Sequence, residues 1–149
     1  MTMLKAQFVG VYEINGKAVS FFRPPHDEPD FLWIDVEELA KAFLPRAAAR
    51  KMLKLAQKPH TDGRISASAQ NGSAIVTIVC HAVAQSLCGA IDQLGGHPAK
   101  KPDDWGGGPA ETAYSIAAGH MMHDHLPLPI EMLMKAFHNQ GGPLLRGLR

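Results

Sequence analysis

The 149-residue chain has no strong excess of charge of either sign, because 15 lysines and arginines face 14 aspartates and glutamates. A net charge of +1 excludes a polycation as a whole, so any nucleic-acid surface must be local. The chain also lacks an apolar run long enough to span a bilayer, and it does not open with a basic segment followed by an apolar core. These absences predict a soluble, cytoplasmic protein that does not bind membranes.

Cysteines are scarce, and Cys80 and Cys88 both lie in apolar surroundings that favour buried, reduced thiols over a disulfide. Catalytic patterns are missing as well. No Walker loop is present, and the glycines at 106–108 follow no predicted strand. Cys80 precedes His81, but adjacency in sequence does not place a thiolate against an imidazole in space. We therefore expect neither an enzyme nor a bound cofactor.

Metal-site chemistry is concentrated in one stretch, where His120, His123 and His125 lie beside Asp124. His120 and His123 share a helix face at i, i+3, and three imidazoles with an open position would suit Zn²⁺ and a hydrolytic reaction. The spacing of the known zinc hydrolases is absent, and no nearby glutamate is placed as a general base. Histidines near a helix C-terminus also interact favourably with the helix dipole. We therefore predict a plain helix end, with these histidines as candidate ligands.

Apolar residues make up 46% of the chain, which is enough to form a core, and the length suits one domain with an appendage. We predict strands at 8–13 and 18–23 around an Asn15-Gly16 turn, followed by a short buried strand at 31–34. Residues 97–109 have the composition of a linker. The expected domains are therefore 1–96 and a short helical appendage at 110–149, which would serve dimer or partner contacts. Further helices are predicted at 81–94, 110–123 and 130–139.

The centre of the chain, from Asp35 to Cys80, carries the strongest structural pattern. Asp35 and Glu38 form a capping-box pattern, and the residues that follow place apolar side chains on one helix face up to Phe43. Leu44-Pro45 ends this helix, and Pro45 is well placed to open a second one. The second helix has its own apolar stripe, formed by Ala49, Met52, Leu53 and Ala56.

A β-hairpin follows the second helix. Residues 64–70 alternate between polar and apolar, Asn71-Gly72 is a strong hairpin turn signal, and 74–80 is an apolar return strand. The order of helix, tight turn, basic helix and hairpin is that of a winged helix-turn-helix. The predicted fold is therefore an α+β, winged helix-turn-helix-like domain with an N-terminal β-hairpin and small sheet, plus short C-terminal helices.

The first two-thirds of the chain, roughly residues 8–95, resemble the Bro-N type domain found at the N-terminus of phage antirepressors and viral Bro proteins. The resemblance rests on the strand pair around Asn15-Gly16, the aromatic strand at 31–34, the Asp-Val-Glu-Glu-Leu-Ala segment at 35–40, and the basic helix and hairpin that follow. It implies DNA binding, control of phage or viral genes, and an origin in a phage, prophage or other mobile element.

Positive charge is concentrated where the resemblance places the second helix, because residues 41–64 hold seven lysines and arginines against Asp62 alone. Arg46, Arg50 and Lys54 recur at i, i+4, i+8, a spacing suited to phosphate contacts, and arginine also reads guanine edges. We predict a transcriptional regulator that binds double-stranded DNA, as a homodimer because duplex readers commonly pair half-sites. The predicted DNA-binding residues are Arg46, Arg50, Lys51, Lys54, Gln57, Lys58, His60, Arg64 and Asn71.

Three other interpretations stay open. The basic face is also compatible with a solvated helix surface, or with a protein-interaction module such as a phage-type inhibitor that binds a host protein through this face and the Met-rich C-terminal helices. The near-neutral total charge and the uncharged hairpin tip favour that module. A histidine-metal hydrolase is the third possibility, and it requires a stoichiometric metal ion.

Overall fold

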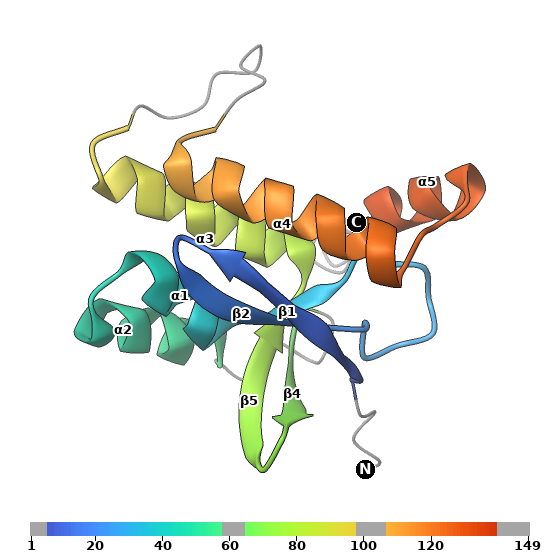
Figure 1. The fold of residues 1–149 in the computed structure, drawn as a ribbon, viewed down its shortest axis with the longest axis horizontal. Coiled ribbons are helices and arrows are strands. Elements are labelled where there is room, and N and C mark those ends of the chain that lie inside the picture. The colour runs from blue at the N-terminus through green and yellow to red at the C-terminus, as the bar shows by residue number, and fades with distance from the viewer. Residues whose placement is uncertain (1–5, 58–64, 98–106, 140–149) are drawn as a thin grey trace, which may run out of the picture.

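The computed structural model describes residues 6–57, 65–97 and 107–139. It is a mixed α+β fold with a 5-stranded antiparallel sheet in the order β1-β2-β3-β5-β4 (Figure 1). The strands are β1 (Phe8–Ile14), β2 (Lys17–Phe22), β3 (Trp33–Asp35), β4 (Ser66–Asn71) and β5 (Ala74–Val79). The helices are α1 (Val36–Phe43), α2 (Arg46–Ala56), α3 (His81–Leu94), α4 (Pro109–His125) and α5 (Ile130–Asn139). The predicted α+β class is confirmed, and each predicted element is present with small shifts at its ends.

The two hairpins form where the sequence has Asn-Gly turns. Asn15 and Gly16 have φ values of 51° and 80°, a left-handed backbone that asparagine and glycine tolerate best. The turn fixes the register of β1 and β2, so that Ile14 lies opposite Lys17. Asn15 also donates from Nδ2 to the carbonyl of Ala42 at 2.7 Å. The first hairpin is thereby attached to the C-terminal end of α1.

Asp35 caps α1 as the sequence predicts, since its Oδ1 accepts from the backbone N–H of Glu38 at 3.1 Å. The predicted return contact of the capping box, from Glu38 to the N-terminal end of α1, is replaced by a contact with the sheet. Glu38 Oε1 accepts from the backbone N–H of Ser20 at 3.0 Å, across to β2. Glu38 therefore satisfies a donor of the neighbouring strand and joins α1 to the sheet.

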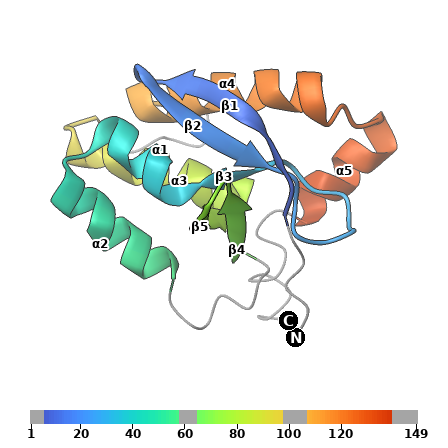
Figure 2. The same cartoon turned by 60° about the horizontal axis from the view of Figure 1, so that its bottom comes forward.

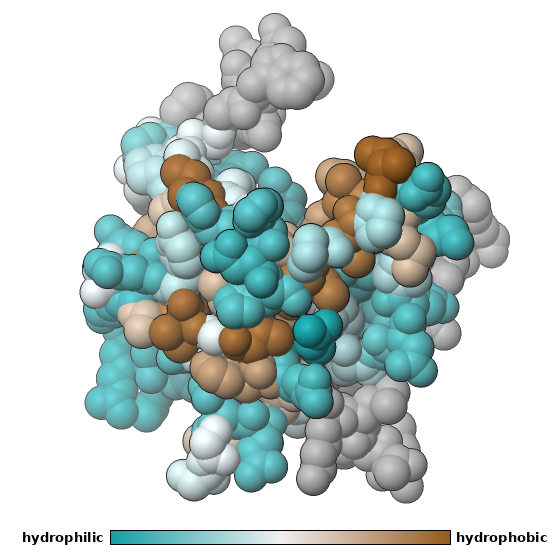
Figure 3. Space-filling model, turned by 45° about the vertical axis from the view of Figure 1, so that its right-hand side comes forward, coloured by the Kyte–Doolittle hydropathy of each residue, from teal (hydrophilic) through white to brown (hydrophobic). Residues whose placement is uncertain are grey.

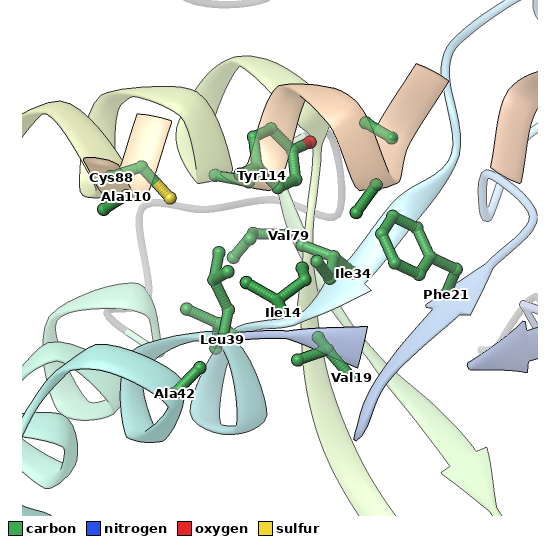
Figure 4. Packing of buried hydrophobic residues seen from close by; sticks show 14 of the residues in the cluster. Ile14, Val19, Phe21, Ile34, Leu39, Ala42, Val79, Cys88, Ala110 and Tyr114 are labelled. Atoms are coloured by element: carbon green, nitrogen blue, oxygen red, sulfur yellow. The ribbon is translucent and has the colours of Figure 1, made fainter. Parts of the chain in front are cut away.

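A single main core lies between the sheet and the helices α1, α3 and α4 (Figure 4). Ile14, Val19 and Phe21 from the first hairpin are almost fully buried there, together with Leu39 from α1 and Tyr114 from α4. A smaller cluster, which includes residues of the β4–β5 hairpin, contains Phe22, Trp33, Ala69, Ile78 and Cys80. Burial of this apolar area supplies most of the favourable free energy of folding.

The predicted boundary at 97–109 does not separate two cores. Helix α4 places Tyr114 and Ala117 at 0% exposure within the same cluster as the sheet residues, so it is an integral part of the domain. Its first turn is held by Asp92 of α3, which accepts from the backbone N–H groups of Ala110 at 2.8 Å and Glu111 at 3.0 Å. The prediction of an appendage was wrong for α4, because the stripe that α4 buries consists largely of small residues.

Helix α5 differs from α4 in its burial. Only Ala136 is fully buried on it, whereas Ile130, Met134 and Phe137 are more than half exposed. Figure 2 shows α5 at one end of the molecule and α2 at the other. Within the described ranges, none of the helices combines the length and apolar character needed to cross a bilayer.

Candidate nucleic-acid interface

Helix α2 has two faces of opposite character. Ala49 is fully buried, and Met52 and Leu53 pack against the main core from partly buried positions. The predicted DNA-contacting residues of this helix all lie on the exposed side: Arg46, Arg50, Lys51 and Lys54. The sequence pattern therefore placed these residues correctly on the surface of the molecule.

The positive charge on this surface is not neutralised locally. Within the described part of the chain, none of these α2 cations forms an ion pair, whereas Lys41 of α1 pairs with Glu37 at 2.7 Å. The first turn of α2 contains no acidic residue, and its N-cap, Pro45, provides no side-chain hydrogen bond. The helix dipole contributes further positive potential at that end. The α2 surface can thus attract an anion without first breaking an internal pair.

Gln57 and Asn71 are engaged inside the molecule. Gln57 follows α2 and donates from Nε2 to Thr77 Oγ1 of β5 at 2.9 Å. Asn71 lies at the end of β4 and donates from Nδ2 to Ser20 Oγ at 3.1 Å. Neither amide is therefore free to read a base in this arrangement, and both fix the hairpin to its surroundings. The remaining predicted contacts, Lys58, His60 and Arg64, lie outside the described residues.

The β4–β5 hairpin extends beyond the strand it pairs with. β3 is only 3 residues long, and β5 pairs with it through Val79 and Ile78 alone. Beyond these residues the strand pairing is between β4 and β5 alone, up to Asn71 and Ala74, and Figure 1 shows the hairpin extending away from the helices. Its turn residue Gly72 has a φ of 62°. The hairpin is thus joined to the sheet at its base by β3, and near its tip Asn71 is hydrogen-bonded to Ser20 of β2.

The histidines of α4 do not converge on a common point. His120 stacks on Tyr12 with ring centroids 5.6 Å apart, and His123 Nδ1 lies 3.1 Å from Asp124 Oδ1. The carbonyl of His125 accepts from Arg23 at 3.4 Å. Among the residues that the structure describes, no group of three or more His, Cys, Asp or Glu side chains is placed to hold a metal ion. The ring of His120 instead contacts β1, whereas His123 interacts with the adjacent Asp124 of its own helix.

A second polar cluster, which the sequence did not reveal, surrounds the first residue of α3. His81 Nδ1 lies 2.6 Å from the hydroxyl of Tyr114, and its ring packs between those of Tyr114 and Phe31. Burial lowers the pKa of His81 to about 4, so the imidazole is neutral at pH 7. Burial raises the pKa of the neighbouring Cys80 thiol to about 11, so Cys80 is not a thiolate nucleophile.

Asp30 forms a further buried network next to this cluster. Its carboxylate accepts from the backbone N–H of Phe31 at 2.8 Å and from Trp33 Nε1 at 3.0 Å. Asp30 Oδ2 also lies 3.0 Å from His26 Nε2, and this hydrogen bond raises the pKa of His26 above its ordinary value. The spacing of His26, Asp30 and Trp33 at i, i+4 and i+7 was the available sequence signal, but nothing in the sequence distinguished it from a polar loop.

An apolar pocket of about 420 Å³ opens beside His81, between the C-terminal half of α4 and α5. Its polar lining comes from His81, Ser115 and His123, and the apolar walls come from Phe31, Ala118, Met122, Leu126, Leu128 and Leu133. The pocket is lined mainly by α4, α5 and the segment that joins them, and Figure 2 shows α2 and α5 at different ends of the molecule. The fold therefore carries two separate candidate surfaces: an exposed cationic helix and an apolar pocket.

No protein-family model, curated protein or solved structure matches this chain.

Proposed function

We propose that the protein is a small DNA-binding regulator that contacts duplex DNA through the exposed basic face of α2. The proposal rests on the cations of that face, which form no ion pair within the described part of the chain. The face lies opposite the side of α2 that packs on the core. In a nearly neutral protein, free positive charge that is concentrated on one helix is most directly explained by an anionic partner that binds there. DNA phosphates are such a partner.

The arrangement of elements supports a winged-helix mode of binding. Helices α1 and α2 are separated only by Leu44 and Pro45, and the β4–β5 hairpin follows. In helix-turn-helix proteins, the second helix of the pair enters the major groove. The resemblance to Bro-N domains adds a role in phage or mobile-element gene control, of the antirepressor type. In this proposal α2 is the recognition helix, and the hairpin contacts the flanking backbone.

The dimensions of α2 are compatible with phosphate contacts. Arg46 and Lys54 are separated by eight helical steps, or about 12 Å at 1.5 Å per residue. Arg46, Arg50 and Lys54 are spread over that distance, so that each side chain can contact a different phosphate. Three such contacts predict that log K falls with log salt at a slope of about −3. Binding should therefore weaken steeply as the salt concentration rises.

The test is fluorescence anisotropy with a mixed duplex pool across a salt series. Arg50→Ala combined with Lys54→Ala should abolish most of the binding and leave the fold intact, because both side chains are exposed and unpaired. The matched control is Arg23→Ala with Lys135→Ala, which removes the same charge near α4 and α5 and should retain the binding. Equal binding by the wild type and a correctly folded α2 double variant would overturn the proposal.

A protein-interaction module is the second candidate function, and the apolar surface of α5 favours it. Ile130, Met134 and Phe137 are 65%, 63% and 57% exposed, and Figure 3 shows one apolar patch at the upper right besides others on the same face. Exposed apolar residues that lie together commonly mark association sites. In the DNA-binding proposal this face joins two copies into a homodimer. An interaction module without DNA binding would show no affinity for the duplex pool even at low salt.

A further inference from the structure

The pocket beside His81 has a polar group at its wall that the fold itself does not satisfy. Tyr114 is fully buried, and its hydroxyl has His81 Nδ1 as its hydrogen-bond partner at 2.6 Å. His81 Nε2, on the other side of the ring, has no partner in the described part of the chain. Among the described residues, His26 Nδ1 is the one fully buried side-chain nitrogen or oxygen atom that lacks a hydrogen-bond partner. His81 Nε2 is therefore not fully buried, and it retains access to the open pocket that His81 lines.

The hydrogen bond with Tyr114 fixes the tautomer of His81. A phenol hydroxyl must donate its proton, and His81 Nδ1 is the acceptor available to the buried Tyr114 hydroxyl. The opposite tautomer would leave that proton unpaired, at a cost of about 1–3 kcal/mol. Tyr114 therefore donates to Nδ1, and the neutral imidazole carries its own hydrogen on Nε2. His81 thus presents one N–H donor to the pocket.

The rest of the pocket restricts the chemistry of an occupant. Most of the lining is apolar, and about 420 Å³ is near the lower end of the range for small-molecule sites. The lining contains no lysine, arginine, aspartate or glutamate, and burial keeps His81 neutral by lowering its pKa. A charged ligand would lose hydration against these apolar walls, and the other imidazole of the lining, His123, is largely exposed beside Asp124.

From this geometry we propose that the pocket binds an uncharged, compact, apolar molecule whose carbonyl or similar acceptor receives a hydrogen bond from His81 Nε2. Rings or branched apolar groups would occupy the space between Phe31, Met122 and Leu133. The site is separate from the α2 surface, so the inference does not depend on DNA binding. Because Leu126 and Leu133 flank the connection from α4 to α5, an occupied pocket would also hold α5 against the body.

Nile red is a suitable probe, since it is uncharged, aromatic and carries a carbonyl. We expect saturable 1:1 binding to the full chain with increased fluorescence. Gly119 lines the pocket, and a Cβ added there would meet nothing within 4 Å, so Gly119→Leu should place its side chain in the pocket and abolish binding. Ala90→Leu adds the same side chain at an exposed position of α3 and should bind as the wild type does. Ser115→Leu is a second blocking variant should Gly119→Leu fail to fold.

Recognition of the acceptor is tested by competition with 1-indanone and indane, which differ by one carbonyl group. One net hydrogen bond predicts that indanone competes about threefold to tenfold better. That preference should disappear in the His81→Phe, Tyr114→Phe double variant, which removes the donor and the buried phenol together.

Three results would overturn the inference. They are Nile red binding that survives both blocking variants, equal competition by the two compounds, and binding that weakens as the protein concentration rises. The last result would assign the pocket to a second copy of the chain.

Discussion

Acid should destabilise this protein through His81, and the size of the effect follows from its burial. The imidazole packs between Phe31 and Tyr114, and burial holds its pKa at about 4 against an ordinary 6.5. A depressed folded-state pKa gives a contribution to stability that is complete above pH 6.5. It is lost as the pH falls toward 4, because the unfolded chain takes up a proton that the folded chain refuses. The loss amounts to about 3 kcal/mol at pH 4.

The perturbation that isolates this contribution is His81→Gln, which removes the titrating group and keeps an acceptor for the Tyr114 hydroxyl. Urea unfolding, followed by tryptophan fluorescence, gives the free energy of unfolding of both proteins from pH 8 to pH 4. The difference in free energy of unfolding between the wild type and the variant should change by about 3 kcal/mol over this pH range. All other titratable groups are present in both proteins, so their contributions cancel in that difference. Tyr114→Phe keeps the imidazole and should keep the acid-dependent loss. Parallel curves for the wild type and His81→Gln would refute the reasoning.

Two further changes test the packing. Asp92→Ala removes the acceptor for the Ala110 and Glu111 N–H groups, and it should lower the free energy of unfolding by about 1–2 kcal/mol in urea titrations. Asp92→Asn should be closer to the wild type because it retains one acceptor oxygen. Leu39→Ala, at 0% exposure, should cost about 2–5 kcal/mol, whereas Leu94→Ala, at 77% exposure, should cost under about 0.5 kcal/mol. Equal losses at the two leucines would contradict the assigned core.

Elements with local signals could be predicted from the sequence. The Asn15-Gly16 turn needs a left-handed backbone that these two residues supply, and Asp35 caps α1 from a position next to the helix it serves. The same holds for the exposed side of α2, because a 3.6-residue period separates Arg50 and Lys54 from Ala49. In each of these cases the determining residues lie within a few positions of the structure they specify.

Side-chain partners that are distant in the chain could not be predicted this way. Glu38 was expected to complete a capping box, but its carboxylate accepts from Ser20, on a strand that becomes its neighbour only in the folded sheet. Gln57 was expected at a base edge, yet Thr77 lies within 2.9 Å of its amide. A side chain that can bond in several ways takes the partner that tertiary packing brings close. Periodicity therefore identifies the exposed face of a helix but not which of its amides remain free.

Helix α4 shows why a helix whose buried face has a weak apolar pattern in the sequence can be mistaken for an appendage. Its buried stripe consists of Ala110, Tyr114, Ala117, Ala118 and Met121, and small residues give little apolar signal in sequence. Small side chains nevertheless allow α4 to approach α3 closely, and Tyr114 then fills the core beside Cys88. The same insertion places the Tyr114 hydroxyl against His81. The closure of the core by α4 and the hydrogen bond between Tyr114 and His81 thus have one structural cause.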